Sequence, residues 1–256
     1  MKRILNFVKN MKSNFIWEET CLVVPDYKSI QTQRQWIFFH YYNDFFKAFG
    51  KNRQQVVEIG CGRCSIGQYF ARDGKKVECF DINPEAVAVA EENFKRAGLT
   101  GSFKIEDATR CSLGRYSRKY RDFIVSVGLI EHLESGSYQK VFSEAFRSLR
   151  PGGMLAMINV PKKFSIQTFF QKHDHLHREA LTPEDYVKAA KEAGFDIVKY
   201  IYVNPFPLVE TYGNMKKELI ITKIFKFIYW IRSWFMEYPM VGSKLFSQAH
   251  LLICIK

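Results

Sequence analysis

The sequence of 256 residues lacks the segments that would send a protein out of the cell or across a membrane. Residues 1–9 mix basic side chains with a broken apolar run, whereas a secretory signal needs about 7–15 apolar residues together. The most apolar stretch covers residues 219–236. Lys223, Lys226 and Arg232 interrupt it, and each charge would cost about 2.5–3.5 kcal/mol at the centre of a bilayer. We therefore expect neither secretion nor a membrane-spanning helix.

Cysteine is sparse, with six residues scattered along the chain. Cys61 and Cys64 form one C-x-x-C pair, and without a second pair the usual zinc site is excluded. Two small residues that line a turn explain this pair better than redox chemistry does. Cys79 and Cys254 fall in predicted buried strands, where a thiol is an ordinary core side chain. We therefore expect a reducing compartment, the cytoplasm.

Acidic residues are few relative to basic ones, with 26 Asp and Glu against 38 Lys and Arg, so the net charge is +12. This excess suits a nucleic acid, an anionic membrane or an acidic small substrate. However, no long run of consecutive basic residues stands out, and the aromatic residues sit among aliphatic ones rather than between arginines, unlike a single-strand-binding surface. The composition therefore favours a membrane surface or an anionic small substrate over nucleic acid.

A glycine-rich turn is the most informative local feature. An apolar strand containing Glu58 runs directly into a turn with Gly60 and Gly62. Glycine lets main-chain N–H groups approach a ligand closely, because it has no Cβ. The dinucleotide fingerprint would need a third glycine where Ser65 stands, and a phosphate-binding loop would need a lysine where Gln68 stands. The turn therefore predicts a nucleotide-like ligand that is held without a phosphate nest.

Strands and helices alternate after this turn. Asp81 ends the next strand about 20 residues later, where a ribose-binding carboxylate is expected, and Asp107 ends the strand after that. The alternation predicts a parallel sheet. The predicted strands after the turn cover residues 76–82, 103–108, 122–127, 154–160 and 250–255, and the predicted helices include residues 84–97 and 141–149.

The E-x-G-x-G pattern at Glu58, Gly60 and Gly62 resembles motif I of the class I S-adenosylmethionine (SAM) methyltransferases. Residues 149–153, which read L-R-P-G-G, are similar to a turn that this family carries before its fifth strand. The resemblance covers residues 55–203 and the last strand. It implies a doubly wound, mostly parallel seven-stranded sheet with helices on both faces and an antiparallel last strand. It also implies SAM as the cofactor and S-adenosylhomocysteine as the product.

By this resemblance, Asp81 would bind the ribose hydroxyls, Ile82 would pack on the adenine, and Asp107 would accept from the adenine amino group. Cys64 stands where the family usually has another small residue, often glycine, and it is small enough for the turn to persist. The implied cofactor site consists of Glu58, Gly60, Gly62, Asp81, Ile82, Asp107, Ala108 and Val127.

Two histidines are candidates for the acceptor side. His132 follows the fourth strand, and His177 precedes a Thr-Pro-Glu helix start as a histidine does in the family. Either side chain could act as a base or simply hold its loop. The segment before His132 is similar to the E-x-x-E-H metal motif of some O-methyltransferases, but Gly128 replaces the first Glu and Tyr138 replaces a further His. We therefore expect no metal.

The sequence predicts that the chain has two parts. Residues 1–54 are predicted to form an N-terminal helical segment that covers the cleft, and residues 55–256 the SAM-binding domain, with an aromatic and basic helical insertion at about residues 206–247. Within it, residues 219–236 predict an interfacial helix, a lid over an apolar acceptor or a helix buried against the core.

The predicted function is O-methylation of a small lipid-linked or sugar-linked acceptor in the cytoplasm, in contact with the inner face of a membrane. The N-P-P-Y signature of amide and adenine N-methyltransferases is absent after the fourth strand, which favours an oxygen or carbon acceptor. RNA methylation and a non-catalytic SAM-binding partner protein are the alternatives.

Overall fold

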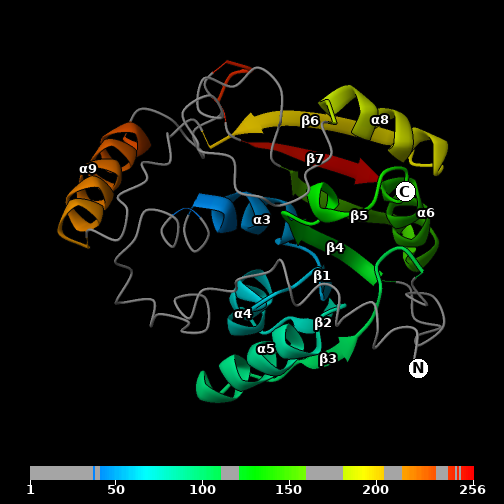
Figure 1. The fold of residues 1–256 in the computed structure, drawn as a ribbon, viewed down its shortest axis with the longest axis horizontal. Coiled ribbons are helices and arrows are strands. Elements are labelled where there is room, and N and C mark those ends of the chain that lie inside the picture. Colours follow the sequence, from blue (N-terminus) through cyan, green and yellow to red (C-terminus); the bar gives the residue numbers. More distant parts are fainter. Residues whose placement is uncertain are drawn as a thin grey trace.

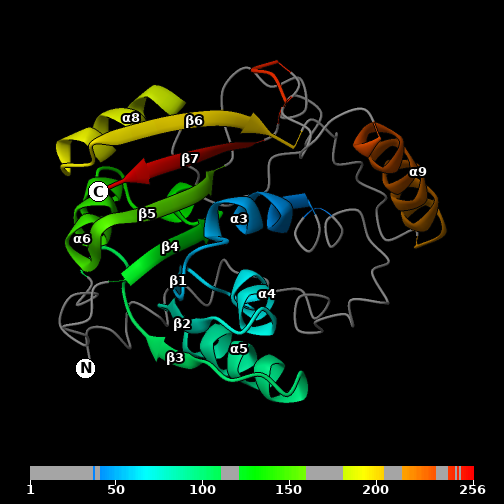
Figure 2. The same ribbon diagram turned by 180° about the vertical axis from the view of Figure 1, so that it is seen from behind.

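A seven-stranded sheet in the order β3-β2-β1-β4-β5-β7-β6 runs through the molecule (Figures 1 and 2). The computed structural model describes residues 37, 41–110, 121–159, 181–204, 215–234, 242–245, 247 and 249–256. β7 is antiparallel to both of its neighbours, and the other pairs are parallel, which confirms the predicted fold class. The strands are β1 Gln55–Ile59, β2 Lys76–Asp81, β3 Ser102–Ile105, β4 Arg121–Val127, β5 Leu149–Asn159, β6 Ile197–Val203 and β7 Ala249–Ile255.

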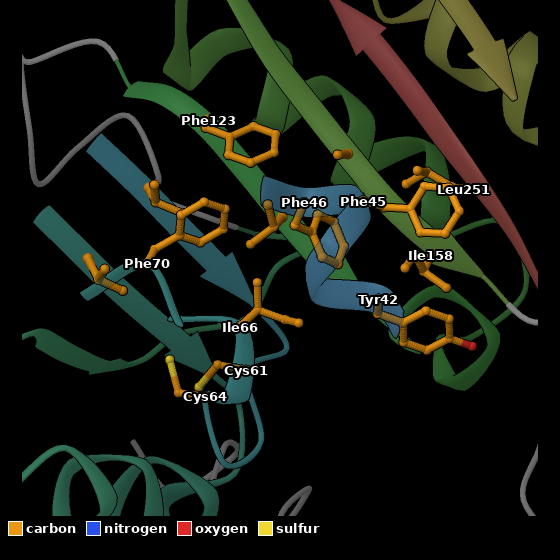
Figure 3. Close-up of a cluster of buried hydrophobic side chains, with 14 of the residues drawn as sticks. Tyr42, Phe45, Phe46, Cys61, Cys64, Ile66, Phe70, Phe123, Ile158 and Leu251 are labelled. Atoms are coloured by element: carbon orange, nitrogen blue, oxygen red, sulfur yellow. The ribbon is translucent and has the colours of Figure 1, made fainter. Parts of the chain in front are cut away.

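Helices cover both faces of the sheet, and each face has its own buried core. The first core includes Tyr42, Phe46, Phe70 and Phe123, which pack between the sheet and its covering helices (Figure 3). One face carries α3 Tyr42–Gly50, α4 Ser65–Arg72 and α5 Pro84–Arg96, and the other carries the short 3₁₀ helix η5 Ile130–His132, α6 Tyr138–Ser148 and α8 Pro183–Glu192.

Local sequence signals set where two of these helices begin. The Asn83 side chain accepts a hydrogen bond from the Glu85 N–H at the start of α5, with Pro84 in the first turn. At α8, Thr182 and Asp185 form a reciprocal capping box. The start of α5 was predicted from these local residues, and the Thr-Pro-Glu start of α8 from the family resemblance.

The start of β5 differs from its prediction. Residues 150–153 were expected to form a turn before a strand at Met154, but β5 begins at Leu149, which already pairs with Arg121 of β4. The register then shifts, so that Phe123 pairs with Met154 and the residues between bulge out of the ladder. Gly152 accommodates this bulge with a positive φ of 71°.

Helix α9, Met215–Ser233, stands away from the sheet at one end of the molecule (Figures 1 and 2). Within the described parts of the chain, no helix has both the length and the apolar character needed to cross a membrane. Only α3 and its immediate neighbours are described from the predicted N-terminal segment, and α3 buries Phe45 and Phe46 in the first core. The cleft-covering role of residues 1–54 stays a prediction.

Candidate active site

The glycine turn after β1 has the conformation that its residues imply. Gly60 and Gly62 have φ values of 61° and 49°, in the left-handed region that strains other residues. A Cβ on Gly60 would lie 2.8 Å from Cδ1 of Leu129 in the loop after β4. Glycine at this position therefore lets the β4 loop approach the turn, and it brings the ends of β1 and β4 together.

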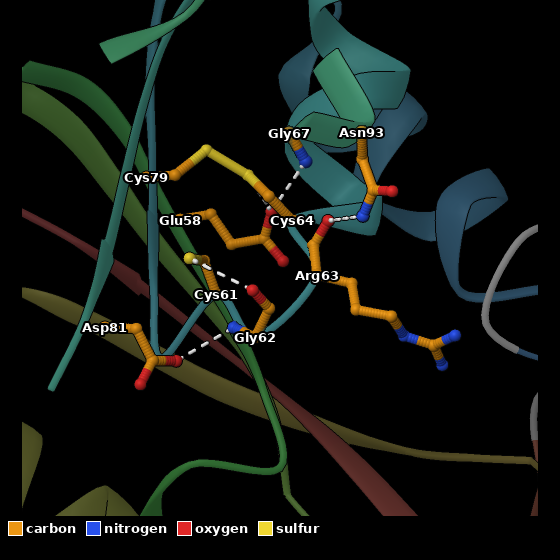
Figure 4. The surroundings of a disulfide bond; sticks show 9 residues. All are labelled: Glu58, Cys61, Gly62, Arg63, Cys64, Gly67, Cys79, Asp81 and Asn93. Atoms are coloured by element: carbon orange, nitrogen blue, oxygen red, sulfur yellow. Dashed lines mark hydrogen bonds between the residues drawn. A yellow bond between two sulfur atoms is a disulfide. The ribbon is translucent and has the colours of Figure 1, made fainter. Parts of the chain in front are cut away.

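Glu58 lies beneath the turn rather than on its surface (Figure 4). Its carboxylate accepts a hydrogen bond of 2.7 Å from the Gly67 N–H in the first turn of α4. Burial raises the pKa of Glu58 to about 8, and the negative charge of Asp81 adds to this, although the Gly67 hydrogen bond opposes it. Glu58 thus joins the strand to the helix, and its predicted contact with a cofactor stays a prediction.

Asp81 stands at the end of β2 with one oxygen on the turn. Its Oδ2 accepts from the Gly62 N–H at 2.8 Å, and its Oδ1 accepts from the Asn83 N–H at 2.9 Å. Burial raises its pKa above the usual value, and these two hydrogen bonds oppose the shift. Each carboxylate oxygen keeps a lone pair for a further donor, which suits a ribose diol. Ile82 is half-buried beside it.

Asp107 is brought beside Asp81 by the β2–β3 pairing, since the Glu106 N–H donates to the Asp81 carbonyl. Oδ1 of Asp107 accepts from both the N–H and the hydroxyl of Thr109, which fixes its orientation. Ala108 packs against the second core, and Val127 ends β4 against the first. The predicted cofactor residues therefore all lie at the carboxyl ends of β1 to β4, on one edge of the sheet.

The structure describes one of the two predicted histidines, His132. His132 is half-buried in η5, and its main-chain N–H donates to Leu129, which contacts Gly60. It therefore lies on the loop next to the turn, and its role stays a prediction. His177 lies outside the described residues.

The charges of the edge fit a cation. Asp81 and Asp107 place two acidic side chains on this edge, whereas Glu58, whose pKa is raised to about 8, is mostly protonated near pH 7. Such a negative site opposes a pyrophosphate, but it attracts a cationic sulfonium group. The residues present therefore fit SAM.

Comparison with known proteins agrees with this geometry. The sequence profile described as "Methyltransferase domain" matches residues 56–153, from β1 to the bulge of β5. Residues 56–153 therefore form a methyltransferase domain, and the chain is similar to the class I SAM-dependent methyltransferases. SAM is accordingly its cofactor.

Three relatives of this methyltransferase illustrate the likeness. It is 21% identical over 171 residues to a ubiquinone biosynthesis O-methyltransferase of Cupriavidus pinatubonensis, covering 62% of this chain and 67% of that protein. It is 31% identical over 107 residues to a botryococcene C-methyltransferase of Botryococcus braunii, covering 41% of this chain and only 27% of that protein. The solved PH0226 protein of Pyrococcus horikoshii shares its fold, with a TM-score of 0.62, 17% identity and coverage of 93% and 99%.

Beside the cofactor edge, the methyltransferase has a polar pair that the sequence reasoning missed. Asn159 at the end of β5 pairs in register with His250 at the start of β7, and both are fully buried. Within the described residues, neither the Asn159 amide nor the His250 imidazole has a hydrogen-bond partner. Burial lowers the pKa of His250 to about 4, so the imidazole is neutral near pH 7. The sequence did offer one signal for this pair, because Asn159 and His250 are polar residues at the ends of two apolar strands.

This pair continues the cofactor edge. The Gly128 N–H donates to the Ile158 carbonyl, which places the loop after β4 directly beside Asn159. The ring of Tyr186 from α8 lies 4.9 Å from the His250 ring. The pair therefore lies on the side of the β4 loop away from the glycine turn.

The cysteine predictions need correction. Cys64 and Cys79 form a disulfide, so Cys79 is not an ordinary core thiol and Cys64 does more than line the turn (Figure 4). Cys61 and Cys254 are buried free thiols. β1–β2 pairing brings the bridged residues together, which sequence spacing does not reveal, and one bridged pair removes the basis for inferring a reducing compartment. Among the described residues, the one group with metal-ligand spacing is Glu58 with these two bridged sulfurs.

Proposed function

We propose that this methyltransferase methylates a hydroxyl oxygen of a lipid-linked acceptor at the inner surface of a cellular membrane. SAM supplies the methyl group bonded to a sulfonium. The chain must then hold the acceptor oxygen in line with that group and receive the hydroxyl proton. The exposed apolar surface of α9 is the observation that carries the lipid part of the proposal.

Among the exposed large apolar side chains of α9, five that are 39% to 58% exposed share one side of the helix. Their helical spacing places them in one stripe along the helix. Thr222, on a different side of the helix, is buried, and Phe225 packs against the first core. Of the three alternatives for this segment, the exposed stripe supports a membrane contact or a lid over burial against the core. The stripe consists of Ile220, Ile224, Phe227, Ile228 and Ile231.

Aromatic and basic residues flank this stripe. The rings of Trp230 and Trp234 meet at 4.9 Å, and the two residues are 52% and 71% exposed. Exposed lysines include Lys216, Lys223 and Lys226. An apolar stripe with tryptophan and lysine beside it is typical of a helix that lies in the plane of a membrane surface. The net charge of +12 adds attraction to anionic lipids.

Asn159 and His250 support an oxygen acceptor. A neutral imidazole can accept the hydrogen of a hydroxyl while the Asn159 amide donates to its oxygen. Ser126 to Leu129 occupy the place of the N-P-P-Y signature of amide and adenine N-methyltransferases, which argues against those nitrogen acceptors. The names of the two sequence relatives, an O-methyltransferase of ubiquinone biosynthesis and a C-methyltransferase of botryococcene, are consistent with a lipid acceptor.

Vesicle sedimentation tests the membrane part. We expect the protein to bind phosphatidylglycerol vesicles and to bind neutral phosphatidylcholine vesicles much less. The I224E/F227E variant should lose at least about tenfold in affinity, because two charges would enter the apolar boundary. Ile197→Glu, which changes a similarly exposed residue on β6, is the matched control and should bind normally. Equal binding by both variants would remove α9 as the contact.

Transfer of radioactive methyl from SAM to a cell extract tests the acceptor. Label should enter the lipid fraction and should be released by treatments that cleave methyl ethers or esters. Label in RNA would instead establish an RNA methyltransferase. Bound SAM with no label in any fraction would establish a non-catalytic binding protein.

A further inference from the structure

The glycine turn is bonded to three successive residues of β2, which are Cys79, Phe80 and Asp81. Two of these bonds are hydrogen bonds, from the Cys61 N–H to the carbonyl of Phe80 and from the Gly62 N–H to the Asp81 carboxylate. The third is the covalent bridge to Cys79. The bridge therefore acts on the same turn that positions the cofactor-binding edge.

Cys64 occupies a conformation that it does not itself prefer. It is the N-cap of α4 with a φ of 55°, in the left-handed region that a residue with a Cβ rarely adopts. Its sulfur lies 3.1 Å from the Glu58 carboxyl, which also receives the Gly67 N–H. A Cβ on Gly67 would collide with this sulfur. The surroundings, and the bridge among them, thus hold Cys64 in place.

We propose that the Cys64–Cys79 bridge is a reversible redox site that controls cofactor affinity. With the bridge closed, the turn is preorganised for SAM. An external thiol or dithiol opens it by giving two electrons and two protons, which leaves two cysteine thiols while the reductant becomes a disulfide. The turn then keeps only its two hydrogen bonds to β2, and the affinity falls. This inference rests on SAM as the cofactor and not on the acceptor.

The reductant must come from outside the chain. Cys61, the other cysteine of the turn, is buried, and its pKa is raised by that burial, so it stays a protonated and unreactive thiol. Cys64 and Cys79 are both fully buried, so an attacking thiol reaches the bridge only when the turn opens.

Cofactor and bridge are then thermodynamically linked. If the closed form binds the cofactor tenfold more tightly, the bound cofactor makes the bridge tenfold harder to reduce. For this two-electron couple a factor of ten corresponds to about 30 mV. Binding and reduction thus give two independent measurements of one coupling.

The test uses the full chain in two redox states. One sample is equilibrated with oxidised glutathione and the other with dithiothreitol, and differential alkylation with peptide mass spectrometry verifies the state of Cys64 and Cys79. Calorimetry then measures the affinity for S-adenosylhomocysteine. We expect at least tenfold weaker binding in the reduced sample, recovery on reoxidation, and slower reduction when the ligand is bound.

Variants separate the bridge from other thiols. The C64S/C79S variant should bind as the reduced wild type does and should not respond to dithiothreitol. Cys254→Ala, which removes a buried free thiol on β7, should keep the full redox response. If the C64S/C79S variant fails to fold, the reduced wild type still tests the proposal, because it carries no substitution.

Affinities within twofold of each other in the two verified states would overturn the proposal, as would alkylation of both cysteines after treatment with oxidised glutathione. Absence of binding in both states would overturn the cofactor assignment itself. Neither result depends on which acceptor the enzyme uses.

Discussion

The cofactor edge and helix α9 are built in opposite ways. At the edge, a short turn is held to β2 by two hydrogen bonds and a disulfide, and its acids are largely buried. Along α9, large apolar side chains face solvent, while Thr222 is buried and Phe225 packs against the first core. A rigid edge suits a constant cofactor that must be aligned accurately. An exposed apolar helix suits a surface that the protein meets from outside.

Asp81→Ala should have the largest effect on the rigid side of this comparison. It removes the acceptor for the Gly62 N–H and the proposed partner of the ribose hydroxyls. Two charge-assisted hydrogen bonds lost on binding correspond to about 100-fold or more in affinity. Calorimetry measures the affinity for S-adenosylhomocysteine. Asp196→Ala, at the far end of the sheet, is the control. An unchanged affinity would remove the ribose assignment.

His250→Phe tests the boundary between the two regions. If the pair serves the acceptor, turnover should fall by about 100-fold while cofactor affinity stays the same. The variant should also melt higher, by about 2–4 °C for each kcal/mol gained, because a buried imidazole with no hydrogen-bond partner among the described residues costs about 1–3 kcal/mol. Thermal unfolding and methyl transfer measure the two effects. A variant that melts higher and keeps full turnover would show that His250 is only a core residue.

Glu58→Gln should have a smaller effect, on pH dependence. The pKa of Glu58 is raised to about 8 in the folded state from an ordinary value near 4.5, so the folded protein binds more protons between these values. Its contribution to stability is therefore complete below about pH 4.5 and is lost as the pH rises through about 8. Urea unfolding of the wild type should show this fall, by about 1 kcal/mol or more. In Glu58→Gln, the fall should be reduced, and an identical pH profile would contradict the assignment.

Much of the rigid region could be predicted because its signals are local. Gly60 and Gly62 follow an apolar strand, Asp81 and Asp107 end or follow the next two, and Asn83 and Thr182 cap helices within a few residues of themselves. The start of β5 was placed too late, because the pairing of Leu149 with Arg121 depends on a neighbouring strand. On the acceptor side, composition identified α9 as unusual but could not say which side of it faces solvent.

The sequence by itself determined the class of the fold, the family and the edge of the sheet at which the cofactor residues gather. Hydrophobic periodicity, capping and glycine conformations act over a few residues, so each can be recognised from the local sequence. Only the tertiary structure decided that Cys64 meets Cys79, that Asn159 faces His250 and that the apolar stripe of α9 is uncovered. Each of these facts depends on which strands or helices become neighbours: the disulfide joins residues 15 positions apart, and the β5–β7 pairing joins Asn159 to His250, 91 positions later in the chain.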